Sequence, residues 1–234
     1  MTRAPDGIPR RVFLKQTSAF SLLAGMGAVG CSRTVQRPTG PHLPLVEPGP
    51  MLPPVPAVLL TVDGPPDGPD EISVVWTFVV NGDPPQIGIS VGDEHVAGAL
   101  IAAHREFVLN VPTADIVDAF DKVDMNSGSP GDKFEMAGLT RGRAIRIAAP
   151  TVEEAPIHVE CRVFDTIEVP PARTIFLAEV LATVVIQGTC DETGRLIVPA
   201  APIFGMTAGS GEFYTMGRLV GHIGQSVGRT DIKY

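Results

Sequence analysis

Short apolar runs, each ended by glycine, proline or aspartate, follow one another along this chain and restrict its fold more than any other feature. In the clearest run, residues 157–163, apolar side chains alternate with polar ones, the two-residue period of a strand with one buried face. Pro170-Pro171 then turns the chain, and residues 175–186 return as the partner strand. The same signs predict strands at residues 57–62, 72–78, 86–91 and 107–111.

Helical patterns are few. Residues 95–104 are rich in alanine, leucine and isoleucine at helical spacing, and we expect Thr113 to cap a second helix that runs to about Val123. Six or seven strands with few helices predict a mainly β fold, a closed β-barrel rather than a layered α/β sheet.

The first 31 residues have the order of an export signal. The basic Arg10-Arg11 pair is followed by an uncharged run over residues 17–30 and then by Cys31. A bilayer span needs ~20 apolar residues, so the run is too short for one. The arginine pair resembles a twin-arginine (Tat) signal, and the residues before Cys31 resemble a lipobox, which implies a lipidated cysteine. An uncleaved anchor or a buried helix is the alternative.

Residues 32–55 are rich in proline, which keeps a chain extended, and we expect them to form a tether. The folded domain is then residues 56–234. This organisation predicts a protein that is exported through the Tat pathway to the periplasm or the outer face of a bacterial membrane. Its contact with the membrane would be the lipid anchor only.

Net charge argues against a nucleic-acid partner, and cysteine content argues against a disulfide framework and a metal site. Six of the 18 basic residues and one of the 26 acidic residues precede Pro38, so the remainder carries a net charge of −13. A surface this acidic repels phosphate backbones, and we expect no nucleic-acid partner. Cys161 and Cys190 are too few for a disulfide framework, and no spacing of histidine and cysteine predicts a metal site.

Four stretches in this order resemble the flavin reductase-like family of FMN-binding split barrels, and most closely its flavoredoxin branch. They are residues 71–77 (EISVVWT), 84–92 (PPQIGISVG), 107–112 (FVLNVP) and 132–140 (DKFEMAGLT). The likeness extends over residues 56–224. It implies an FMN-binding oxidoreductase that passes electrons or hydride through the flavin, and a homodimer with the flavin sites at the subunit interface.

The resemblance also implies which residues lie near the flavin. No nucleophile with a partnered histidine stands out in the sequence, so we expect no catalytic residue from the chain itself. Strand backbone would supply N–H groups to the ring, and a glycine would let it approach a phosphate closely. The cofactor-binding residues expected are Ser73, Val74, Trp76, Thr77, Ser90, Val91, Gly92, Asn110, Pro112, Ser127, Gly128 and Lys133.

Each of these positions also has a structural interpretation. Trp76 fits a core position, and Ser73 and Ser90 fit the polar edges of half-exposed strands. Asn110 fits a residue that satisfies a turn. Residues 132–134 fit the capped start of a helix with Phe134 buried.

The chain departs from the family at Asp93-Glu94, where the family has a basic or hydroxyl cluster that helps to hold the phosphate. Each acidic charge near a phosphate costs ~1 kcal/mol even when solvent screens it. A degenerate barrel that binds a ligand but no flavin therefore stays open. Export leaves a second alternative, an exported electron-relay flavoprotein without NAD(P)H activity, because nicotinamide nucleotides are cytoplasmic. The electron donor and acceptor are unknown from the sequence.

Overall fold

The computed structural model describes residues 39–41, 49–192, 194–197, 201–208 and 210–229. Arg10, Arg11 and Cys31 lie outside the described residues, as does most of the predicted tether. The chain divides into two compact units, residues 1–44 and 45–234, and the helices and strands named below belong to the second unit. No helix in the described part of the chain has the length and apolar character needed to cross a membrane.

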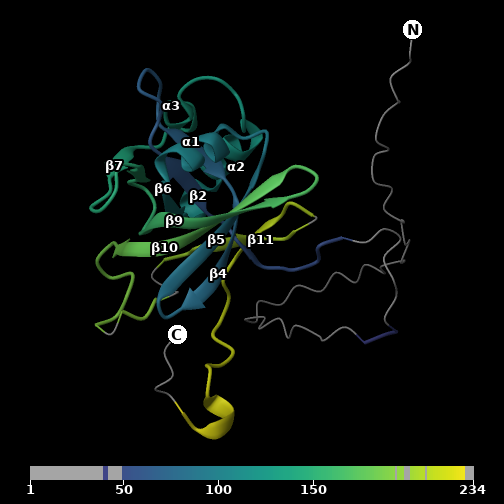
Figure 1. Ribbon diagram of the computed structural model, residues 1–234. Helices are drawn as coiled ribbons and strands as arrows, with labels where there is room; N and C mark the ends of the chain where they lie inside the picture. Colours follow the sequence, from purple (N-terminus) through teal and green to yellow (C-terminus); the bar gives the residue numbers. More distant parts are fainter. Residues whose placement is uncertain (1–38, 42–48, 193, 198–200, 209, 230–234) are drawn as a thin grey trace, which may run out of the picture. The chain divides into compact units, whose positions relative to one another are not determined.

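One seven-stranded antiparallel sheet forms the body of the domain, in the order β3-β2-β6-β9-β10-β5-β4 (Figure 1). The strands are β2 (Leu59–Val62), β3 (Glu71–Val74), β4 (Trp76–Gly82), β5 (Pro85–Gly92), β6 (Glu106–Val111), β9 (Ile157–Val169) and β10 (Arg173–Val185). The two strands at the ends of this order, β3 and β4, are separated in the chain only by Val75. The sheet therefore closes on itself, which confirms the predicted β-barrel.

This closure corrects one prediction. The single strand expected over residues 72–78 is two strands that divide at the buried Val75, because β3 pairs with β2 whereas β4 pairs with β5. A strand that changes partners must bend at the change, and periodicity along the chain does not record which partner a residue has.

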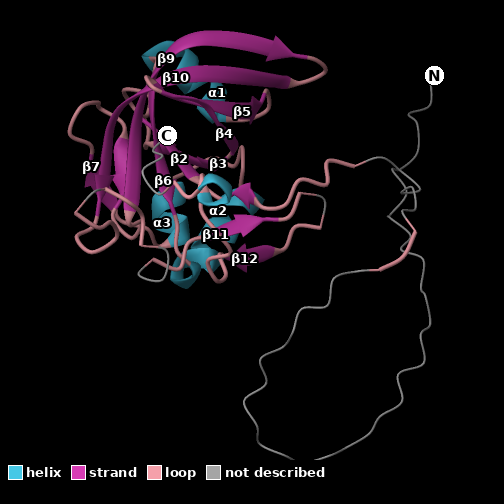
Figure 2. Ribbon diagram, turned by 90° about the horizontal axis from the view of Figure 1, so that it is seen from below, coloured by secondary structure: helices cyan, strands magenta, loops and turns pink. Residues whose placement is uncertain are grey.

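The predicted β9–β10 hairpin is present and turns at Pro170-Pro171. Cys161 lies opposite Val180. The pairing shifts register between Leu177 and Ala178 and again between Val180 and Ala182. Figure 2 shows the end of this hairpin reaching beyond the shorter strands around it.

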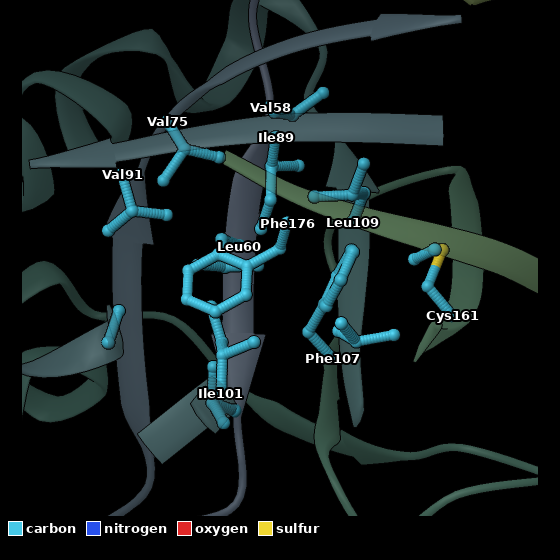
Figure 3. Close-up of a cluster of buried hydrophobic side chains, with 14 residues drawn as sticks. Val58, Leu60, Val75, Ile89, Val91, Ile101, Phe107, Leu109, Cys161 and Phe176 are labelled. Atoms are coloured by element: carbon cyan, nitrogen blue, oxygen red, sulfur yellow. The ribbon is translucent and has the colours of Figure 1, made fainter. Parts of the chain in front are cut away.

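The barrel interior is filled by aliphatic and aromatic side chains from almost every strand. Figure 3 shows Leu60, Ile89 and Phe176 pointing toward one another from β2, β5 and β10. Ile101 adds to this core from α1 (Val96–His104), the helix predicted at residues 95–104. Leu60 and Ile89 are completely buried, so the interior is a packed core and not a ligand channel.

A second core lies outside the barrel, where α2 (Val117–Met125) and α3 (Lys133–Ala137) cover β2 and β3. The Phe120 ring meets Phe204 and Phe213 edge-on, at centroid distances of 5.2 and 5.6 Å. These two partners belong to a small sheet of β1 (Val55–Pro56), β11 (Phe204–Met206) and β12 (Phe213–Thr215). The predicted boundary between tether and domain thus falls inside β1.

The start of the second predicted helix differs from the prediction. Thr113 makes no side-chain capping bond; it forms a bridge with Ile203 instead. The 3₁₀ turn η1 (Ala114–Ile116) then leads into α2. Prediction also missed the short pair β7 (Arg141–Arg143) and β8 (Pro150–Val152), because three residues are too few to show a period.

Candidate functional site

Four residues meet at one end of β4, β5 and β10. Trp76 lies opposite Ser90, and Gly92 lies opposite Arg173. The Arg173 guanidinium stands 4.8 Å from the centroid of the Trp76 ring. Its Nε donates to Ser90 Oγ at 2.8 Å, and its Nη2 donates to the Ser90 carbonyl at 2.7 Å. We call Trp76, Ser90, Gly92 and Arg173 the strand-end cluster.

The Trp76 indole is 47% exposed, so the interpretation of this residue as core is wrong. A half-exposed tryptophan held by an arginine is a flat apolar surface with a cation beside it. Such a surface suits a planar aromatic ligand with an anionic group.

The acidic turn Asp93-Glu94 adjoins this cluster, and both carboxylates have partners. Asp93 accepts a hydrogen bond from the Thr174 hydroxyl at 3.2 Å. Glu94 lies 3.2 Å from His95 Nε2. A Cβ added at Gly92 would collide with the Glu94 carboxylate, so the space above this glycine is already shared with an acidic side chain.

Two buried polar atoms beside the acidic turn have no hydrogen-bond partner among the described residues: His95 Nδ1 and Ser127 Oγ. The loop that carries Ser127 touches the turn, since the Cβ position of Gly128 lies 3.7 Å from the Glu94 carbonyl oxygen. The nearby Asp124 has its pKa raised, chiefly by burial. Unpaired buried groups are exceptional in folded proteins, and an oxygen of a ligand or of water commonly satisfies them.

Lys133 lies elsewhere, in a buried network on α3. Its Nζ is 2.5 Å from Glu71 Oε1 and 3.2 Å from the Ile72 carbonyl oxygen. Ser73 Oγ donates to the same Glu71 oxygen at 2.6 Å. Ser73 is completely buried, so its interpretation as the edge of a half-exposed strand is wrong. The role predicted for Lys133 and Ser73 toward a cofactor stays a prediction.

The start of α3 confirms the capped-helix interpretation. The Asp132 carboxylate accepts from the backbone N–H groups of Phe134 and Glu135, at 3.0 and 3.2 Å, and the Phe134 ring is buried. Arg141 donates to Asp132 at 2.7 Å, and this bond is the main cause that lowers the pKa of the Asp132 carboxyl.

Asn110 is completely buried, and its side-chain amide joins three strands. The amide nitrogen donates to the Leu59 carbonyl at 3.0 Å and to Thr61 Oγ1 at 3.1 Å, while the amide oxygen accepts from Val152 N–H at 2.9 Å. Both amide hydrogens are therefore used within the protein. Its predicted contact with the flavin is untested.

The other predicted residues contribute through packing or backbone. Val74, Val91 and Pro112 are buried, and the Thr77 hydroxyl donates to the Gly88 carbonyl at 3.1 Å. The structure thus brings Trp76, Ser90 and Gly92 together and places Ser127 and Gly128 beside the adjoining acidic turn. Sequence reasoning missed Arg173, whose place next to Gly92 follows only from the register of β5 with β10.

The cysteines are not part of this site. Burial raises the pKa of the Cys161 thiol to about 12, with Glu160 as the second cause, so this thiol stays protonated near neutral pH. Cys161 and Cys190 are both free. Within the described ranges, no three histidine, cysteine or acidic side chains gather in a way that could hold a metal ion.

A cavity of about 1090 Å³ lies apart from the strand-end cluster. It is lined mainly by apolar residues of β1, β11 and the segment 214–221, among them Pro54, Phe204 and Met216. None of the four cluster residues lines it.

The sequence matches the family described as "Flavin reductase like domain" over residues 53–197. An uncharacterized protein of Archaeoglobus fulgidus is 27% identical over 113 residues, which are 48% of this chain and 63% of that protein. The chain thus spans less than two thirds of that relative. A second uncharacterized protein, from Pyrococcus abyssi, is 27% identical over 123 residues, 53% of this chain and 70% of its own.

Two solved flavoredoxins have the same fold. That of Desulfovibrio vulgaris superposes with a TM-score of 0.71 at 22% identity, over 78% of this chain and 97% of its own. That of Methanosarcina acetivorans gives a TM-score of 0.71 at 23% identity, over 80% and 100%. These likenesses confirm the split-barrel fold.

Proposed function

The chain belongs to the flavin reductase-like domain family, and on that basis we propose that it is an FMN-binding oxidoreductase of the flavoredoxin type. The observation that carries the proposal is the strand-end cluster. Three residues that the resemblance places beside a flavin, Trp76, Ser90 and Gly92, lie together there and are partly open to solvent at the indole.

The residues of the cluster suit a flavin in two ways. The Trp76 indole offers a flat apolar face, and the Arg173 guanidinium beside it offers N–H donors to a polar edge. His95 Nδ1 and Ser127 Oγ flank the adjoining acidic turn and have no hydrogen-bond partner among the described residues. A bound flavin supplies the hydride and electron transfer, so the chain need supply only binding, orientation and tuning.

We predict that purified protein binds FMN and then shows the flavin bands in its visible spectrum. Trp76 is the only tryptophan, so its emission should fall as FMN binds beside it. The same sample should scatter light as a particle of twice the chain mass.

NADPH consumption by the protein with bound FMN would identify a reductase. The absence of NADPH consumption would identify an electron relay. A parent protein that binds no flavin would contradict the proposal.

We propose a homodimer because apolar side chains remain exposed on β4 and β9. Val79 is 77% exposed, and Phe78, Val80, Phe164 and Ile167 are each more than 40% exposed. Large apolar side chains that stay exposed on strands are typical of surfaces that a partner covers.

A second candidate function is the binding of an apolar ligand without flavin, which the cavity of about 1090 Å³ favours. Its volume is in the range of small-molecule sites, and its lining is mainly apolar. In that case an apolar dye should bind the protein, and FMN should not displace it.

We further propose that the protein is exported folded and anchored by lipid at Cys31. Replacing Arg10 and Arg11 by lysine should leave the precursor in the cytoplasm, because twin-arginine export depends on that pair. Replacing Arg33 and Arg37 by lysine is the matched control. Mass spectrometry of the membrane fraction should find a lipidated Cys31 as the first residue. An intact chain from Met1 without lipid would overturn this proposal.

A further inference from the structure

The chain has the acidic pair Asp93-Glu94 at the position where the family resemblance implies a basic or hydroxyl cluster beside the FMN phosphate. The proposed site therefore needs its positive charge from another residue. We infer that Arg173 supplies it from the neighbouring strand β10 and binds the phosphate group of the flavin nucleotide. This inference rests on the proposed function and adds to it the residue that distinguishes FMN from riboflavin.

The first support is position. Arg173 is paired with Gly92 across β5 and β10, so it lies one residue from the acidic turn in the register of the sheet. The turn is also tied to the start of this strand, because Asp93 N–H donates to the Ala172 carbonyl at 3.2 Å. Arg173 thus places a positive charge beside residues 93 and 94, although it lies about eighty positions later in the chain.

The second support is charge. Arg141 and Arg162 form ion pairs with acidic side chains, whereas Arg173 forms none with any described residue. The two carboxylates nearest in the chain to Gly92 are engaged by Thr174 and His95. A guanidinium stays protonated, so Arg173 keeps a full positive charge that is available to an anion.

The third support is orientation. Arg173 Nε donates to Ser90 Oγ, and its Nη2 donates to the Ser90 carbonyl. The Trp76 ring packs against the guanidinium, with its centroid 4.8 Å away. The remaining N–H donors of the fork have no partner among the described residues, and they are held in place without a ligand. A planar fork that is fixed in this way binds a phosphate oxygen with little loss of side-chain entropy.

The test compares FMN with riboflavin, which lacks the phosphate, on the full chain and on Arg173→Gln. Binding is followed by flavin fluorescence as well as by Trp76 emission, because the substitution itself changes the surroundings of the indole. We expect Arg173→Gln to weaken the affinity for FMN by about 10- to 100-fold, the range for one charge-assisted hydrogen-bonding group. The affinity for riboflavin should change by less than about twofold. Arg173→Lys should retain part of the preference for FMN.

The matched control is Arg162→Gln, which removes one positive charge from the exposed side of β9. It should leave both affinities within about twofold, and circular dichroism should show that each variant keeps the β fold. If Arg173→Gln weakened the affinities for FMN and riboflavin equally, the inference would be overturned, and Arg173 would contact the flavin ring and not the phosphate. Unchanged FMN affinity would overturn it too. A parent that binds neither flavin would instead reject the proposed function itself.

Discussion

Lys133→Met should lower the free energy of unfolding by about 3–5 kcal/mol, the range for breaking a buried ion pair from one side. Lys133 is 4% exposed, and its ammonium lies against the Glu71 carboxylate and the Ile72 carbonyl. Methionine fills similar volume but leaves the Glu71 charge buried, with the Ser73 hydroxyl as its one remaining donor among the described residues. Urea unfolding followed by circular dichroism measures the loss.

Two further variants show whether the pair itself is responsible. Lys122→Met on the exposed side of α2 should change stability by less than about 0.5 kcal/mol. Glu71→Gln combined with Lys133→Met should be more stable than Lys133→Met alone, because the combination removes the uncompensated charge. FMN titration of folded Lys133→Met separates this structural role from the predicted role toward the cofactor, which predicts weaker FMN binding. A selective loss of FMN affinity without loss of stability would show instead that Lys133 serves the phosphate.

Asn110→Leu is the second change with a large expected effect, again of about 3–5 kcal/mol in the free energy of unfolding. In a fully buried place it deprives Val152 N–H of its acceptor and removes the amide donor to the Leu59 carbonyl and to Thr61 Oγ1, whose hydroxyl still donates to the Pro150 carbonyl. A buried group left without its partner costs about 1–3 kcal/mol. Thermal and urea unfolding measure the total.

The control for Asn110 is Asn126→Ala, which removes a half-buried asparagine whose exposed hydrogen bond to the Lys122 carbonyl measures 2.8 Å. Its cost should stay below about 1 kcal/mol, as for an exposed hydrogen bond. Amide exchange at Val152 should accelerate in Asn110→Leu, because that N–H loses its acceptor. If Asn110→Leu were as stable as the parent, the three-strand link would be wrong.

Both residues show how far local patterns reach. The resemblance to the family implies that Asn110 and Lys133 lie beside the cofactor, because both stand in its motifs. The structure surrounds each of them with partners from segments about forty to sixty residues away. A motif identifies a position that a family uses, but it does not separate a residue that holds the ligand from one that holds the strands around it.

Glu160 is a further case. The alternating pattern of residues 157–163 puts it on the polar face of a half-buried strand, yet it is completely buried. Its carboxylate accepts the backbone N–H groups of Ile145 and Arg146 at 2.9 and 2.7 Å. The loop that covers this face is irregular, and no periodic signal in the sequence marks where such a loop packs.

Period, turn residues and neighbours along the chain predict most strands of the seven-stranded sheet, the hairpin at Pro170-Pro171, α1 and the barrel class. The folded structure is needed to see that β3 and β4 divide at Val75, that Asn110 and Lys133 are buried in networks, and that Arg173 lies beside Trp76 and Gly92. These facts depend on which strand pairs with which and in what register. Register is set by packing between segments far apart in the chain, which composition and local period do not encode.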